Sequence, residues 1–437
     1  MREKLLKIAK ILTIIFMSLT FLAVFLPDGF VVGVLKLTFR ANVFELLIRW
    51  FSYVSFLVLP IAIFFNRPTF KKIAIYFSLP VLIVRLFMFP QMLEMFTSDV
   101  VSGLVNMKIL PEFVKEFMSN GVFRSLLFFA IAISELLVIG YIIYDDWKVL
   151  KFKKNEILPF ILVLITSIFA IMPIYTLETL FNTRTDIIFE RFSIYHLAWA
   201  LFLVLEGVVL YLIFRKKSEE DRYILVLLMS LCLLIQYNQL FSTLNEITIE
   251  RLPFMLCNVA AYITVISIAF KVRGLFIFNI LVNVLGGIIA FIVCDVEKIG
   301  LFAFDNLHYI TEHNNVILIP ILSLALGVFK PIEKKDYKTF VIYFSVYFII
   351  VFIFGTMFNA IGTALNDKEY YYCNYIYLFD PETAGELIPF TKVFYDVNFT
   401  IGDAIFYPIV QPAIYLIFIG IGTLTFFILK KKDVKKN

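Results

Sequence analysis

The chain has 437 residues, of which 61% are hydrophobic and 17% are charged, and its mean hydropathy is +0.91. A water-soluble domain of this length cannot bury so much apolar surface, so the composition excludes a soluble globular protein. The net charge is +5, but the basic residues stand in short segments between apolar runs and form no patch interleaved with aromatic side chains. This arrangement argues against a nucleic-acid partner and indicates a membrane protein.

A membrane-spanning helix needs about 20 apolar residues. The third apolar segment of this chain contains Pro80, Arg85 and Pro90, so its ends are less well defined and eleven spans is the nearest alternative. The first segment is read as a retained helix, because no small-residue cleavage motif follows it. The predicted fold is an all-α polytopic transmembrane helical bundle of about twelve spans, at residues 8–26, 45–65, 73–94, 122–144, 157–176, 192–214, 223–241, 252–270, 274–294, 313–329, 338–359 and 405–429.

Clusters of basic residues alternate with these apolar segments. Between consecutive clusters there is room for two spans and one loop with few basic residues, which is the pattern of the positive-inside rule. We therefore expect a multi-pass cell-membrane protein with both termini in the cytoplasm. The longest outer loop, 360–404, is rich in Tyr, Asn and Asp and either packs over the outer face or stays solvated. The clusters lie at 2–10, 67–72, 148–154, 215–222, 271–273, 330–338 and 430–436.

Three charged residues fall deep inside predicted spans. Arg85 and Glu135 both lie near the middle of the membrane, in the third and fourth spans. An unpaired charge there costs at least about 2.5–3.5 kcal/mol, so we expect the two to form a pair, either as a structural contact or as part of an ion pathway. Glu206 lies in the sixth span. A secondary transporter or channel-like protein that uses these three residues is one alternative function, although no inverted repeat supports it.

Cysteine is scarce, and its spacing excludes the common metal and redox motifs. The four cysteines are Cys232, Cys257, Cys294 and Cys373, and no two of them form a C-x-x-C pair. Cys294 and Cys373 fall on the same predicted outer face, so a disulfide between them stays open. We expect no metal and no cofactor.

Two histidines and one cysteine are predicted at a common depth near the outer surface. The eighth span enters from outside at Leu252, which puts Cys257 about one and a half turns below the surface. His313 falls in the first turn of the tenth span, and His196 one turn into the sixth. A thiol with a neighbouring base can attack ester carbonyls, which predicts acyl transfer or ester cleavage on lipids. The alternative is an inert buried cysteine with histidines that bind headgroups or water.

Four short motifs stand in order in the second half of the chain: FSIYHL at 192–197, LPFMLCNVAA at 252–261, EHNN at 312–315 and CNYIYL at 373–378. They resemble motifs of the YwaF family of bacterial integral membrane proteins, which includes animal transmembrane protein 164. The order and spacing agree over about residues 190–437, and this resemblance implies a seven-helix family core at 191–437 and an accessory region of about five helices at 1–190.

The resemblance implies a function and a set of site residues. Transmembrane protein 164 is an acyltransferase that moves fatty acyl chains between phospholipids with a Cys–His pair, and related membrane hydrolases use Thr–His. By resemblance, Cys257 is the nucleophile and His313 the base, with phospholipid or lysophospholipid as substrate. The motifs depart from the family at Met255, Asn258 and Asn314, where His, Asp and Gly are common. Expected supporting residues are His196, Asn258, Asn314, Asn315, Asn374 and Tyr375.

Two further alternatives have less support. A polytopic glycosyltransferase that uses a lipid-linked sugar needs acidic residues in an early outer loop, and the first outer loop offers Asp28 alone. A non-catalytic scaffold of the cell envelope would use the first five helices as its docking surface.

Overall fold

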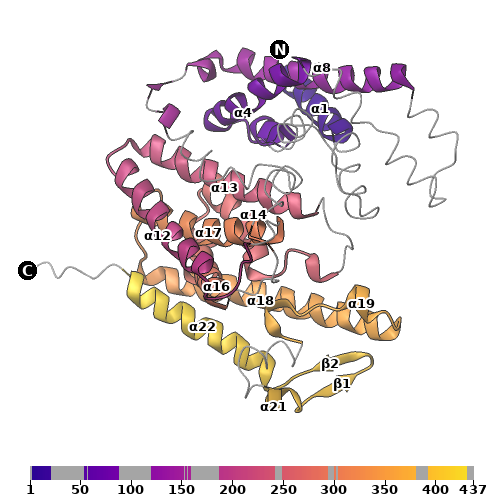
Figure 1. Ribbon diagram of the computed structural model, residues 1–437, viewed down its shortest axis with the longest axis vertical. Coiled ribbons are helices and arrows are strands. Elements are labelled where there is room, and N and C mark those ends of the chain that lie inside the picture. The colour runs from indigo at the N-terminus through magenta and orange to yellow at the C-terminus, as the bar shows by residue number, and fades with distance from the viewer. Residues whose placement is uncertain are drawn as a thin grey trace, which may run out of the picture. The chain divides into compact units, whose positions relative to one another are not determined.

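The computed structural model describes residues 2–20, 54–56, 58–87, 120–151, 153–154, 156–158, 187–241, 249–293, 300–301, 304–379 and 392–430 (Figure 1). The chain divides into two compact units. The first comprises Met1–Ile187, Ile235–Glu246 and Gly300–His308, and the second comprises Ile188–Leu234, Ile247–Ile299 and Tyr309–Asn437.

The first unit is helical wherever it is described. α1 packs along α8, and α4 packs against α8 as well. Pro80 lies inside α4 without ending it, which neighbouring helices make possible in membrane proteins. The elements are α1 (Arg2–Thr20), an apolar helix at Val54–Phe65, α4 (Pro68–Phe87), α8 (Gly121–Asp145) and the 3₁₀ turn η3 (Trp147–Leu150).

Basic residues of the first two predicted cytoplasmic clusters pair with carboxylates in this unit. Arg2 donates to Asp145 at 2.5 Å, and Lys71 donates to the other oxygen of the same carboxylate. Lys72 donates to Glu156, which is buried. Burial by itself would raise the pKa of Glu156, but the hydrogen bond from Lys72 helps to hold that pKa below its usual value. These clusters therefore help to hold helix ends together as well as to set orientation.

The second unit begins with helices that are apolar along most of their length. A π-helical turn, η5, connects α15 and α16 into one continuous helix, and such turns occur often at functional sites. The elements are α12 (Ile194–Phe214), α13 (Glu219–Phe241, in this unit as far as Leu234), the 3₁₀ turn η4 (Ile249–Arg251), α14 (Leu256–Ala269), α15 (Arg273–Phe278), η5 (Asn279–Asn283) and α16 (Val284–Val293).

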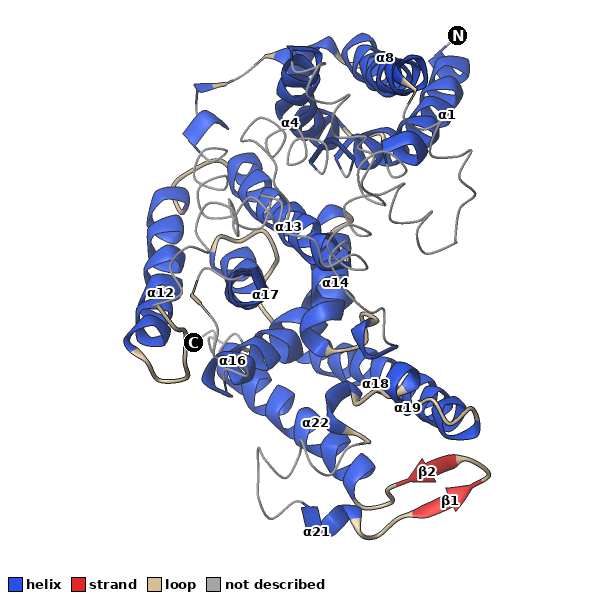
Figure 2. Ribbon diagram, turned by 45° about the vertical axis from the view of Figure 1, so that its right-hand side comes forward, coloured by secondary structure: helices blue, strands red, loops and turns tan. Residues whose placement is uncertain are grey.

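The rest of the second unit holds its longest helix and a β-hairpin, whose strands are red in Figure 2. Tyr337 and Ser345 on α18 bond to Thr423 and Tyr415 on α22 at 3.1 and 2.8 Å, which ties the two helices together. The elements are α17 (Phe304–Ala325, in this unit from Tyr309), α18 (Lys334–Ala364), α19 (Lys368–Tyr371), the 3₁₀ turn η6 (Tyr375–Tyr377), α21 (Lys392–Tyr395), β1 (Phe399–Ile401), β2 (Ala404–Phe406) and α22 (Val410–Leu429).

The helical class predicted from the sequence agrees with the described residues. Two shorter apolar helices, Val54–Phe65 and Leu256–Ala269, fall inside two more of the predicted spans. The count of twelve spans stays a prediction, because several of the predicted segments lie outside the described residues. Five described helices are long and apolar enough to cross a membrane: Gly121–Asp145, Ile194–Phe214, Arg273–Ile292, Lys334–Ala364 and Val410–Leu429.

The predicted start of the tenth span is wrong. The sequence placed it at 313–329 with His313 in the first turn, whereas α17 runs over Phe304–Ala325 and carries His313 near its middle. A span read from hydropathy begins where the apolar run begins. The preceding turns carry polar residues such as Asn306 and Thr311, which are buried, so the helix continues where hydropathy falls.

The predicted loop at 360–404 also has more structure than its sequence suggested. Its end forms the first strand of an antiparallel hairpin in which Thr400 faces Ile405. The last span therefore begins at Val410 and not at residue 405. The apolar alternation in the first strand is limited to Phe399 and Ile401, and a period-2 signal over three residues cannot be distinguished from loop composition.

The membrane topology can be tested with single cysteines introduced at two exposed sites of the second unit. Asp403→Cys places a thiol in the hairpin, and Lys335→Cys places one at the start of α18, in a predicted cytoplasmic cluster. We expect a membrane-impermeant maleimide to label position 403 on intact cells and position 335 only after permeabilisation. The reverse pattern would contradict cytoplasmic termini.

Candidate functional site

His196 lies in the first turn of α12, where Ser193 caps the helix by accepting a hydrogen bond from the His196 amide at 3.3 Å. The Nδ1 atom of His196 accepts from the amide of Phe192 at 2.9 Å. Its Nε2 atom lies 2.9 Å from the carbonyl oxygen of Phe291, and because a carbonyl can only accept, Nε2 donates. The two bonds fix one neutral tautomer and engage both ring nitrogens.

Aromatic rings connect the two predicted site histidines. The ring centroid of His196 lies 5.7 Å from that of Trp199, and Trp199 lies 4.5 Å from Phe291 and 6.1 Å from Tyr309. Tyr309 in turn lies 4.2 Å from His313. These five residues, from α12, α16 and α17, are called the aromatic cluster below. The second unit thus brings His196 and His313 into one group of contacting side chains.

His313 differs from His196 in its hydrogen bonding. Its Nδ1 atom lies 2.7 Å from the carbonyl oxygen of Tyr309, one turn earlier on α17, so Nδ1 donates. In the neutral ring the proton then sits on Nδ1, and Nε2 carries the lone pair that can accept a proton. His313 is 3% exposed, and its ring packs against the ring of Tyr309.

Four asparagine and tyrosine side chains predicted to line the site hold the structure together. Asn314 accepts a hydrogen bond from the indole of Trp199, and Asn315 donates to the carbonyl of Thr311 at 3.0 Å. Two others act in the segment after α19. There, Asn374 accepts from the amide of Phe379 at 3.0 Å, and the Tyr375 hydroxyl donates to the carbonyl of Ile249. Whether these four residues also touch a substrate stays a prediction.

Cys257 lies in the first turn of α14 and is partly exposed. Its thiol donates to Oδ1 of Asn258 at 3.3 Å. Glu312 and Tyr347 both lie within electrostatic range of the sulfur. The approach of Cys257 to His313 stays a prediction, since the hydrogen bond that the described residues give Cys257 is the one to Asn258.

The sequence did not single out Trp199, Tyr309, Glu312 or Tyr347. Helical spacing would have indicated two of them: Trp199 follows His196 by three positions and Tyr309 precedes His313 by four, which puts each on the face of its histidine. Glu312 is a buried acid next to the predicted base. Tyr347 carries no local signal, because it comes from α18 and its hydroxyl donates to the carbonyl of Phe254 at 2.6 Å.

Of the predicted charge pair Arg85–Glu135, the structure describes the side chain of Glu135 only. Glu135 is fully buried in α8 and accepts a hydrogen bond from Ser55. The side chain of Arg85 lies outside the described residues, so its pairing with Glu135 stays a prediction. Glu206 is buried in α12.

Cys373 is a free thiol. It donates to the carbonyl of Gly355 at 3.8 Å, and Asn359 contacts its sulfur at 3.7 Å. The open question of a disulfide is therefore answered for Cys373 in this structure, while Cys294 lies outside the described residues. Burial, with a smaller contribution from the charge of Glu250, raises the pKa of Cys373 to about 12.

The comparisons with known proteins bear on residues 188–429, which match the family model of the TMEM164 family. No curated protein and no solved structure matches the chain. The matched range is more than half of the chain and includes Cys257, His313 and the aromatic cluster. The chain therefore belongs to the TMEM164 family and is a multi-pass integral membrane protein, as the sequence motifs predicted.

The thiols should differ in reactivity toward a small alkylating reagent. In detergent-solubilised protein carrying Cys294→Ser, we expect N-ethylmaleimide at pH 8 to modify the partly exposed Cys257 first. Cys373 should react at least about tenfold more slowly, because its side chain is fully buried and the reagent cannot reach the sulfur. Cys232, buried in α13, serves as the unreactive reference. Peptide mass spectrometry over time measures the rates, and equal rates for Cys257 and Cys373 would contradict the described burial.

Proposed function

We propose that this member of the TMEM164 family is an enzyme that transfers or hydrolyses the fatty acyl groups of phospholipids at the outer leaflet of the cell membrane. Cys257 is the nucleophile and His313 the base. The observation that carries the proposal is the tautomer of His313, in which Nδ1 donates to the carbonyl of Tyr309 at 2.7 Å and Nε2 is the basic nitrogen. A base oriented by a backbone carbonyl has the arrangement that thiol activation requires.

His196, the other predicted site histidine, has a different role. Both ring nitrogens of His196 are engaged by backbone groups, one as acceptor and one as donor. A histidine held in this way cannot take a proton without losing the bond from Phe192. We therefore assign His196 a positioning role: it packs α12 against α16 through Phe291, and Trp199 of α12 in turn contacts the Tyr309 ring that lies against His313.

The reaction proceeds in two halves. His313 Nε2 removes the thiol proton of Cys257, and the thiolate attacks the ester carbonyl carbon of a phospholipid. The amide Nδ2 of Asn258 and nearby backbone amides donate to the oxyanion. The carbon–oxygen bond to the glycerol then breaks, and the departing lysolipid oxygen takes the proton back from His313, which leaves a thioester on Cys257.

The second half releases the acyl group. The hydroxyl of a lysophospholipid, or a water molecule, gives its proton to His313 and attacks the thioester carbonyl. The carbon–sulfur bond breaks, and the thiolate recovers the proton from His313. With a lysophospholipid the result is transfer, and with water it is hydrolysis. The proposal needs no metal and no cofactor, and the partners are membrane lipids.

The exposed apolar faces of two helices, α12 and α18, suit a lipid substrate. α12 and α18 expose rows of large apolar side chains, among them Leu201, Val208, Ile349 and Ile353. Such rows match the acyl region of a bilayer. With both termini in the cytoplasm, the start of α14 lies near the outer headgroups, where ester bonds are found. This orientation is part of the proposal.

Acyl transfer by the purified, reconstituted protein tests the proposal. The vesicles contain a phospholipid with a radiolabelled ester-linked acyl chain and an unlabelled lysophospholipid acceptor. We expect Cys257→Ala and His313→Ala each to lower the rate of label transfer and release by about 100-fold or more, because each removes a reacting group.

The matched control is Cys232→Ala, which removes a buried thiol from α13. It should keep the wild-type rate, and all variants should elute as the same monodisperse species on size exclusion. Full transfer activity in well-folded Cys257→Ala would show that the nucleophile assignment is wrong.

A further inference from the structure

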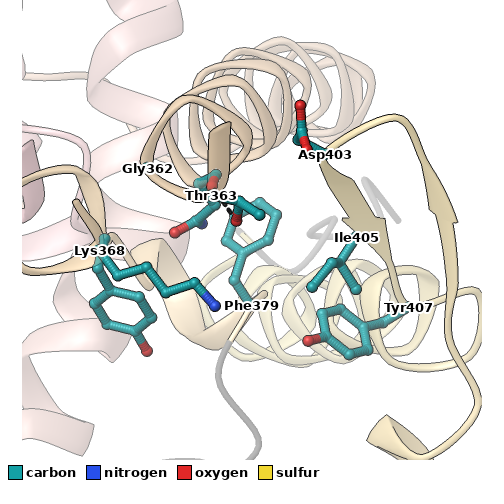
Figure 3. Close-up of a pocket in the computed structure, with 9 residues that line it drawn as sticks. Gly362, Thr363, Lys368, Phe379, Asp403, Ile405 and Tyr407 are labelled. Carbon is teal, nitrogen blue, oxygen red and sulfur yellow. Dashed lines mark hydrogen bonds between the residues drawn. The ribbon is translucent and has the colours of Figure 1, made fainter. Parts of the chain in front are cut away.

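A pocket of about 210 Å³ lies in the second unit between the end of α18, α19 and the β-hairpin (Figure 3). It has no part in the thiol chemistry proposed for Cys257. One wall is apolar and is formed by Phe379, Ile405 and Tyr407. The other side carries polar groups from Thr363 and Lys368. Such a combination of an apolar wall and a few polar groups is typical of ligand sites.

Two opposite charges border this pocket without neutralising each other. Lys368 extends from α19 toward Phe379, and Asp403 sits on the hairpin, away from Lys368 (Figure 3). Within the described parts of the chain, neither side chain takes part in an ion pair. A ligand that carries one negative and one positive group would complement both charges.

The hydroxyl of Thr363 adds to the acceptor side of the pocket. It donates its proton to the carbonyl of Asn359 at 3.0 Å, so its oxygen lone pairs are what it offers to a ligand. An ammonium group needs such acceptors, and Asp403 supplies a charged one. The polar lining thus provides a donor for an anion at Lys368 and acceptors for a cation at Thr363 and Asp403.

The volume limits the size of the ligand. A water molecule occupies about 30 Å³ of liquid, and pockets for complete drug-sized ligands measure roughly 300–1,000 Å³. A pocket of about 210 Å³ therefore suits a group of the size of a phosphate joined to a small amine. A whole diacyl lipid does not fit, so the chains of a lipid ligand would lie outside.

The surface beside the pocket has the composition of a membrane-interface element. The hairpin and the short helix before it expose more large apolar side chains than is usual for a protein surface that faces water. Ile401 is 65% exposed and Val393 67% exposed. Exposed apolar side chains gain free energy by entering the boundary of a bilayer. Further members of this exposed set are Phe394, Val397, Phe399 and Ile405.

We propose that this pocket binds the headgroup of a zwitterionic phospholipid, with the phosphate at Lys368 and the amine at Asp403. The exposed apolar side chains of the hairpin lie among the lipid chains beside it. The site recognises a lipid independently of any reaction at Cys257, so it stands whether or not the chain is an acyltransferase.

Native mass spectrometry of the full-length protein, released from maltoside detergent, tests this site. The probe is dodecylphosphoethanolamine, which has a phosphate, an amine and one alkyl chain but no acyl ester for the enzyme to cleave. We expect one bound probe per chain, and Lys368→Ala should weaken binding by about tenfold because it removes the charged phosphate donor. Asp403→Asn should weaken binding of this probe and leave binding of dodecyl phosphate, which lacks the amine, unchanged.

Two matched variants outside the pocket serve as controls. Lys338→Ala and Asp396→Asn remove exposed charges of the same kinds and should bind like the wild type. Binding by Lys368→Ala and Asp403→Asn that equals the controls would overturn the site. Free phosphoethanolamine or inorganic phosphate that displaces the probe at the probe's own concentration would overturn the lipid assignment, because the alkyl chain would then contribute nothing.

Discussion

Polar groups inside an apolar surrounding have to be satisfied by the protein itself, and this constraint governs the second unit. The carbonyls of Phe291 and Tyr309 each accept from a histidine, and the hydroxyl of Tyr309 donates to the carbonyl of Ala290 at 2.6 Å. Three helices are thereby joined through side chains that would be costly to leave unpaired. The bond of His196 to Phe291 joins α12 to α16, whereas the bond of His313 to Tyr309 lies within α17 and orients the ring locally.

Close approach of the helices depends on small residues at the same contacts. A side-chain Cβ at Gly287 would stand 2.8 Å from Ile317, so a larger residue would push α16 and α17 apart. Inside the continuous helix from α15 to α16, Asn283 donates to Asn279 at 2.6 Å within the π-helical turn. The extra residue of that turn changes which side chains face α14 and α17 from there on. The continuous helix from α15 to α16 is therefore constrained both by close packing at Gly287 and by the hydrogen bond between its two asparagines.

Lipid contact and the proposed lipid recognition depend on different parts of this unit. The apolar faces of α12 and α18 require a bilayer, but they do not select one lipid from another. Selection needs polar groups at fixed positions, and these occur at the partly exposed start of α14 and around the pocket bordered by Lys368 and Asp403. Both lie at ends of helices, where the chain leaves its apolar run and side chains can meet headgroups.

The sequence alone determined the membrane class, the positions of most described helices and the family, because apolar runs, basic clusters and short motifs are local signals. It also brought out Cys257, His196 and His313, since reactive residue types are rare in this chain. It misplaced the start of α17 because buried polar residues such as Thr311 look like a loop to a hydropathy reading. Only the tertiary structure decided that Nε2 of His196 donates, because the backbone carbonyl of Phe291 that it meets comes from a different helix.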